Sequence, residues 1–174
     1  MQRKFMILGL LGWLAGCTFA TPFRGPGYDS GRGITLPLTE QDTVVVGLTH
    51  ATLGDDGAKN AAFTGNIRKI VATMDRHEGL IGYSVRRQLF GNEFWTMTVW
   101  KDEASLIAFI RGREHDQAVL EGSPALADNV FARVILPREA IPLSWDQAEA
   151  LLAKYGTPYP RPVGQATDLT QTVR

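Results

Sequence analysis

The spacing of hydrophobic residues predicts alternating strands and helices over residues 42–156. The run of β-branched residues at 43–49 predicts a strand, and Asp55-Asp56-Gly57 supplies turn and helix N-cap residues soon after it. Residues 80–89 and 94–100 predict two strands joined by a tight turn at Gly91-Asn92. Between the first and second strands, apolar residues recur at helical spacing: Phe63, Ile67, Ile70, Val71 and Met74.

The second half of the chain repeats this alternation. Asp102 and Glu103 begin a second helix, which breaks near Gly112 and resumes over 115–121. A strand follows at 129–136, and a last helix at 145–155 begins after Ser144. The predicted fold is α+β: a ferredoxin-like β-α-β-β-α-β unit with a C-terminal helix. Residues 157–174 are expected to form a loose tail.

The first 41 residues do not share this pattern. Arg3 and Lys4 precede an apolar run at 5–14, which is shorter than the ~20 residues of a membrane-spanning helix. Residues 1–16 therefore resemble a signal peptide. Residues 17–41 are rich in glycine and proline, so they are expected to form a tether between the N-terminus and the folded domain.

Leu14-Ala15-Gly16-Cys17 resembles the lipobox of bacterial lipoproteins, and Cys17 is the only cysteine in the chain. The resemblance implies cleavage before Cys17 and acylation of its thiol, which would anchor the protein to a membrane of the cell envelope. Thr18 stands where an aspartate would favour the inner membrane, so the resemblance implies the outer membrane, facing the periplasm. Ordinary secretion with an unmodified Cys17 and an uncleaved anchor remain as alternatives.

Composition excludes some partners. The apolar fraction of 44 % is that of a globular protein. From Cys17 onward the chain has 16 basic and 18 acidic residues, because Arg3 and Lys4 precede it, so no excess of basic charge indicates nucleic-acid binding. The sequence has no cysteine cluster, His-x-x-x-His spacing, phosphate-binding glycine loop or Gly-x-Ser-x-Gly motif. Neither a metal site nor a resident cofactor is expected.

Strand alternation predicts that the sheet is apolar on both faces. Trp95 and Trp100 point to opposite faces, yet the two helices of the ferredoxin-like unit cover one face alone. A second copy of the sheet packed on the other face would remove its aromatic side chains from water. The sequence therefore predicts a homodimer.

Two segments carry a family resemblance. Residues 79–84 (Gly-Leu-Ile-Gly-Tyr-Ser) lead into the second strand, and residues 94–106 form a strand ending in Val99-Trp100 followed by an acidic helix cap. This arrangement resembles the antibiotic biosynthesis monooxygenase superfamily of dimeric α+β barrels, over about residues 43–136. The resemblance implies a homodimer and a pocket between sheet and helices. Some members oxidise polyketide quinols without a cofactor, and others degrade haem.

The haem-degrading pattern is not matched. Those members use an asparagine on the first strand, a tryptophan in the second helix and a later histidine as axial ligand. Here the first strand has no asparagine, Phe109 takes the tryptophan position, and Val119 falls at the histidine position. His115 lies four residues earlier, about one helical turn away, so a shifted haem ligand stays open.

Several side chains are candidates for chemistry. His50 and His115 are candidate acid–base groups, whereas His77 is expected to be solvated. Arg86 and Arg87 point to opposite faces, so one of them could clamp an anionic or quinone oxygen from the helix side, or pair with an acidic neighbour instead. Three aromatic residues could line a ligand pocket or simply fill the core: Trp95, Trp100 and Phe109.

Two functions therefore follow from the sequence. The first is a membrane-anchored, cofactor-independent monooxygenase acting on a small aromatic or conjugated ligand, with His50, His115 and one arginine as the polar groups of an apolar pocket. The alternative is a non-catalytic lipoprotein that binds a hydrophobic small molecule or haem.

Overall fold

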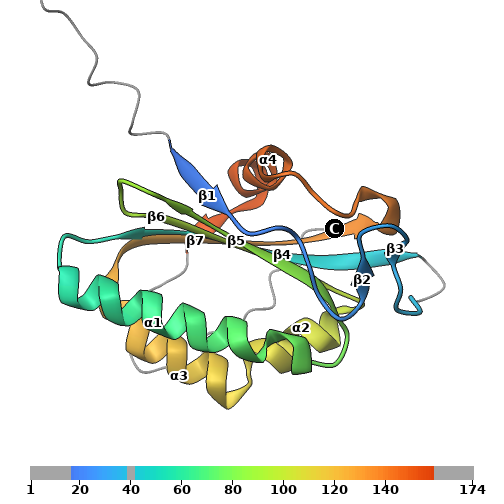
Figure 1. Cartoon of the computed structure of the whole chain (residues 1–174), viewed down its shortest axis with the longest axis horizontal. Helices are drawn as coiled ribbons and strands as arrows, with labels where there is room; N and C mark the ends of the chain where they lie inside the picture. The colour runs from blue at the N-terminus through green and yellow to red at the C-terminus, as the bar shows by residue number, and fades with distance from the viewer. Residues whose placement is uncertain (1–16, 39–41, 159–174) are drawn as a thin grey trace, which may run out of the picture.

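The computed structural model describes residues 17–38 and 42–158, so the expected signal peptide (1–16) and residues 159–174 of the expected tail lie outside the described residues. In this part of the chain, one sheet has six antiparallel strands in the order β1-β5-β6-β4-β7-β8. Figure 1 shows α1, α2 and α3 on one face of the sheet and α4 on the other. The elements are β1 (Thr18–Ala20), β2 (Tyr28–Asp29), β3 (Gly33–Ile34), β4 (Thr43–Leu53), α1 (Gly57–Thr73), β5 (Leu80–Gln88), β6 (Glu93–Trp100), α2 (Glu103–Ile110), α3 (Arg113–Gly122), β7 (Leu126–Pro137), α4 (Trp145–Tyr155) and β8 (Thr157–Pro158).

The predicted ferredoxin-like order is confirmed by β4, α1, β5, β6, the α2–α3 pair and β7. Asp56 caps α1 by accepting hydrogen bonds from the Ala58 and Lys59 amides. Gly112 separates α2 from α3, as the interrupted apolar pattern predicted. Strand β4 is longer than predicted, because Ala51 and Leu53 continue the alternation and are buried.

Strand β4 lies between β6 and β7, and both of its faces are buried. One face carries Val44, Val46 and Leu48, and because it packs against α4 we call it the α4 face. Residues of the opposite parity, including Val45 and Thr49, point toward α1, α2 and α3; we call this the helical face.

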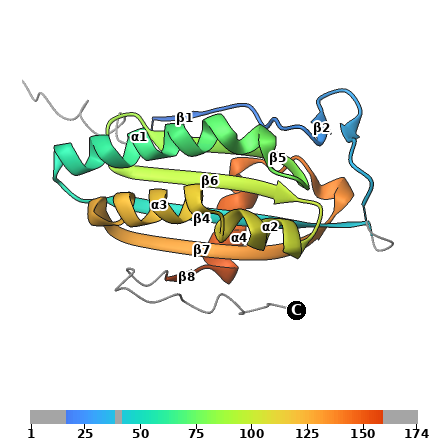
Figure 2. The ribbon, with the colours of Figure 1, turned by 90° about the horizontal axis from the view of Figure 1, so that it is seen from below.

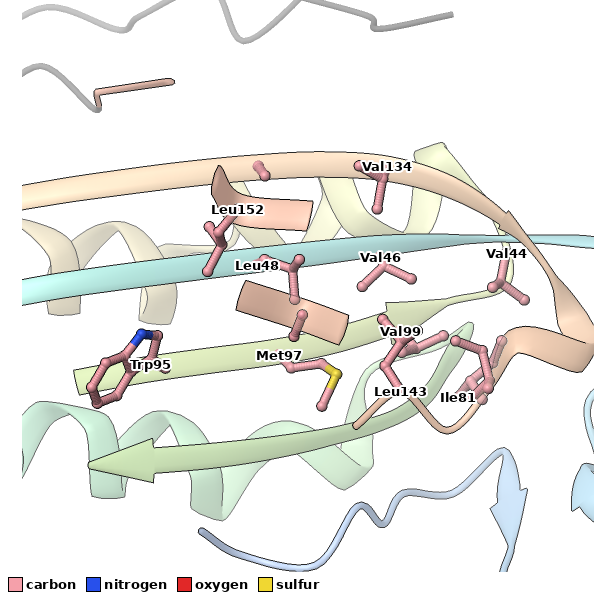
Figure 3. Close-up of a cluster of buried hydrophobic side chains, with 13 residues drawn as sticks. Val44, Val46, Leu48, Ile81, Trp95, Met97, Val99, Val134, Leu143 and Leu152 are labelled. Carbon is pink, nitrogen blue, oxygen red and sulfur yellow. The ribbon is translucent and has the colours of Figure 1, made fainter. Parts of the chain in front are cut away.

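Helix α4 covers the α4 face of the sheet. Ala148 and Leu152 belong to the same buried cluster as Leu48 and Met97. Figure 3 shows Leu143 and Leu152 lying beside the sheet side chains of this cluster. The helix is held at its start by a reciprocal capping box between Ser144 and Gln147.

The N-terminal arm, residues 18–38, differs from the tether expected over residues 17–41. Strand β1 pairs with β5, and the Thr21 and Gly27 amides donate to β5 carbonyls at 2.9 and 3.1 Å. Gly25 passes so close to Gly82 that a side chain on Gly25 would overlap the β5 backbone. Glycine here permits close packing of two chain segments. Five apolar side chains of the arm pack on the α4 face: Phe23, Tyr28, Ile34, Leu36 and Leu38.

This internal cover changes the basis of the predicted homodimer. The prediction assumed that one sheet face would leave aromatic side chains in water. Trp95 is instead 8 % exposed and Met97 1 % exposed within one chain, because the arm and α4 cover that face. The homodimer stays a prediction, and its interface has to lie outside the covered α4 face.

The cover by α4 can be tested by shortening one of its buried side chains. Leu152→Ala should lower the free energy of unfolding by about 2–5 kcal/mol, because it removes buried methyl groups and leaves a cavity. Lys154→Ala, an exposed change on the same helix, should cost about 1 kcal/mol or less. Chemical denaturation measures both. Equal effects would contradict the packing of α4 on the sheet.

Candidate functional site

A cavity of about 290 Å³ lies between the helical face and the helices. Figure 2 shows α1 on one side of this face, with α2 and α3 on the other. Its floor includes Thr49, Ala51 and Thr96, side chains too small to fill the space under the helices. The walls are mainly apolar, and their larger side chains include Phe63, Ile67, Ile70, Phe94, Leu106 and Phe109. The volume is at the lower end of the range for small-molecule pockets.

Two asparagines bring polar atoms to this cavity. Asn66 lies on α1 and is 5 % exposed, and its Oδ1 accepts a hydrogen bond from Lys69 Nζ at 3.2 Å. Asn129 lies on β7, and its Oδ1 is buried without a hydrogen-bond partner among the described residues. An unpaired buried acceptor is costly, so this oxygen is suited to accept a hydrogen bond from a ligand hydroxyl.

His115 is the histidine of the cavity wall. Its Nδ1 lies 3.1 Å from the Ile110 carbonyl oxygen, and since a carbonyl can only accept, Nδ1 carries the proton. In the neutral ring, Nε2 then keeps its lone pair. Burial lowers the pKa of His115, and nearby His77 lowers it further, while the Ile110 hydrogen bond and Asp116 act in the opposite direction. A pKa below the ordinary value keeps the ring neutral near neutral pH, as a general base requires.

His115 also separates the cavity from the surface. With Phe109 it lines a second, more open crevice formed by the end of α1 and the α2–α3 junction. The Phe109 ring lies 4.7 Å from the His115 ring and 5.0 Å from the His77 ring, measured between centroids. The two side chains shared by both hollows therefore form the wall between them.

The structure brings two of the predicted site residues, His115 and Phe109, to one cavity. Trp100 is fully buried and packs against Phe109 at 5.1 Å between ring centroids, behind the cavity wall. Asn66 and Asn129 were missed. A signal existed for Asn66, because it lies within the apolar stripe of α1, where a polar side chain is unusual.

The other predicted site residues do not line this cavity, which corrects the expected pocket. His50 has the parity of the α4 face, where it pairs with Glu93 and stacks on Trp95 at 4.8 Å. Arg86 lies over the same tryptophan at 4.2 Å. It pairs with Glu149 of α4, the acidic partner that the sequence left as an alternative to ligand binding. Arg87 is exposed near the end of β5.

Among the described residues, no group of three histidine, cysteine, aspartate or glutamate side chains is placed to hold a metal ion. Cys17 is exposed and free at the start of the described chain.

Comparison with known proteins gives one family match. Residues 54–120 match the family model described as "Antibiotic biosynthesis monooxygenase". The match runs from the turn before α1 into α3 and includes α1, β5, β6 and α2, which build most of the cavity. A comparison with curated proteins finds no match.

Solved structures resemble part of the chain. A putative monooxygenase from Lactobacillus acidophilus shares 15 % identity over 55 % of this chain, with a TM-score of 0.44, and this chain spans 43 % of its length. A dimeric ferredoxin-like protein of unknown function from Thermobifida fusca shares 18 % identity over 57 % of this chain and 97 % of its own, with a TM-score of 0.46. SnoaB, a cofactor-independent oxygenase from Streptomyces nogalater, shares 14 % identity over 58 % of this chain and 98 % of its own, with a TM-score of 0.44.

The burial of His115 predicts a pH dependence of stability. Its pKa is lowered in the folded state, so the unfolded chain binds the proton more readily. The contribution to stability is therefore present above the unfolded pKa of about 6.5 and is lost as the pH falls through the lowered folded pKa. Unfolding free energies at about pH 7 and about pH 5 should differ less in His115→Gln than in the unmodified chain. An unchanged pH dependence would contradict the buried, neutral histidine.

Proposed function

We propose that this protein is a membrane-anchored envelope lipoprotein whose cavity takes a small aromatic or conjugated molecule, with His115 as the general base of a cofactor-independent oxygenation. The observation that carries the proposal is the placement of His115. His115 lines a mainly apolar cavity, and because its Nδ1–H is held by the Ile110 carbonyl, Nε2 is the ring nitrogen left to accept a proton. The family match over residues 54–120 supports the same class of reaction.

The proposed chemistry starts with a phenolic ligand. His115 Nε2 accepts the phenol proton, and the resulting anion is electron-rich enough to react with dioxygen. One oxygen atom forms a new bond to a ring carbon, which loses its hydrogen. The other leaves as water, so a phenol and O₂ give a quinone and H₂O. The Asn129 oxygen is suited to orient a second hydroxyl, and the aromatic walls pack against the ring.

A non-catalytic binding role is the second candidate, and the mainly apolar cavity wall supports it. Such a protein would hold a hydrophobic molecule or haem. His115 is the cavity side chain that could ligate haem iron, through Nε2. A Soret band that appears on addition of haem and is lost in His115→Ala would support haem binding.

Ligand binding and oxygen uptake distinguish the two roles, with 1-naphthol as a bicyclic phenol probe. Thr49→Phe should abolish binding, because it fills the cavity floor. His115→Gln should retain binding but lower the rate of oxygen uptake about 100-fold or more, the usual contribution of a general base. His50→Gln is the matched control on the opposite face and should change neither quantity. Binding without oxygen uptake in the unmodified chain would contradict the enzyme and favour the binding role.

The proposed anchor is a lipid on Cys17, and Thr18 after it favours the outer membrane, facing the periplasm. Cys17→Ser should remove the added lipid mass from the N-terminal peptide and release the protein from the membrane fraction. A Cys17 peptide of unmodified mass in the unaltered protein would contradict lipidation.

A further inference from the structure

Three exposed hydrophobic side chains gather where the described chain begins. Phe19 of β1 is 57 % exposed, and Leu89 and Phe90, in the loop between β5 and β6, are 44 % and 71 % exposed. Phe19 stands opposite Arg87 in the β1–β5 pairing, and the Leu89 amide donates to the Cys17 carbonyl at 2.9 Å. We call Phe19, Leu89 and Phe90 the hairpin-end patch.

The patch has no cover within the described residues. Two other large hydrophobic side chains of the described residues are exposed, Leu120 and Ile135, but they lie on α3 and β7. A gathering of exposed apolar side chains is typical of a surface that contacts another apolar phase. Folding alone does not account for three such residues on two adjacent segments.

The position of Cys17 in the chain indicates that this apolar phase is a lipid bilayer. Thr18 already pairs with Gln88, so β1 starts at the residue directly after Cys17. One residue spans at most about 3.6 Å, so a lipid on Cys17 leaves no spacer between the bilayer and the β1 end of the sheet. Arg87 is exposed beside the patch, where a cation can meet the phosphate of a lipid headgroup.

We propose that the hairpin-end patch inserts into the headgroup region of the lipid bilayer and seats the domain directly on the membrane. This inference rests on the anchor proposed above and goes beyond it, because it fixes which end of the domain faces the lipid. Phe19, Leu89 and Phe90 supply apolar contact, and Arg87 supplies attraction to anionic lipid. The domain sits on the bilayer surface by one end of its sheet.

A spin label at position 90 tests the orientation in the full-length chain, bound to vesicles of phosphatidylethanolamine and phosphatidylglycerol. Phe90→Cys introduces a single reactive thiol, because acylation blocks the thiol of Cys17. Ile135→Cys is the matched control: it is also an exposed apolar residue, 52 % exposed. It pairs with Val45, seven residues along β4 from the Thr52–Glu93 pair, so it lies about 23 Å along the strands from the hairpin end.

The label at position 90 should collide mainly with oxygen, which concentrates in lipid, and should lose most of its collisions with a water-soluble nickel complex. The label at position 135 should show the reverse. A label at Phe19→Cys should also be shielded from nickel in the otherwise unchanged chain. When Leu89→Ser and Phe90→Ser are added, this label should become accessible to nickel while the lipid keeps the chain on the vesicles.

Two results would overturn the proposal, and they are distinguishable. If the chain floats with vesicles and both labels meet nickel equally, the domain hangs from its lipid and the patch does not insert, although the anchor stands. If the chain fails to float and the Cys17 peptide has unmodified mass, the anchor itself is refuted, and the patch with it.

Discussion

The structure depends on burial of both faces of one sheet. Strand β4 lies at its centre, and its alternating residues place apolar side chains on each face. In a ferredoxin-like unit the helices cover one face, which leaves the other to be covered by something else. Here the chain covers it with its own N-terminal arm and α4, so Leu48, Met97 and Val99 are almost completely buried. This internal cover separates a stabilising face from a face that has room for a ligand.

The helical face is filled less completely, and this difference creates the candidate site. Thr49, Ala51 and Thr96 leave space under α1 and α3, whereas the α4 face has Leu48, Trp95 and Met97 on the same strands. His115 lines this cavity, and burial of its ring lowers its pKa. Asn129 is paired with Ala51, so this polar side chain reaches the cavity at the end of the sheet that also carries the β5–β6 loop.

Much of the fold could be predicted because it depends on local patterns. Helical spacing from Phe63 to Met74 and the break at Gly112 gave elements that the structure confirms. The N-terminal arm could not be recognised in this way. Its glycines and prolines are those of a flexible linker, and its pairing with β5 joins residues more than 50 positions apart. The Gly25–Gly82 contact, which the sequence does not reveal, shows that glycine serves close packing there. The site was partly predictable: His115 and Phe109 meet at the cavity, whereas His50 shares the parity of Val46 and Leu48 and so belongs to the other face.

The residues after Cys17 belong to the folded domain, where β1 extends the sheet beside β5. Hydrogen exchange of the backbone amides measures this directly. The amides of Thr21, Arg24 and Gly27 donate to the carbonyls of Val85, Tyr83 and Ile81 at 2.9, 3.1 and 3.1 Å. They should therefore exchange slowly, together with the amides of β5 and β6. Exchange of these three amides at the rate of an unstructured chain, while β5 and β6 stay protected, would show that the segment is a tether and would contradict its pairing with β5.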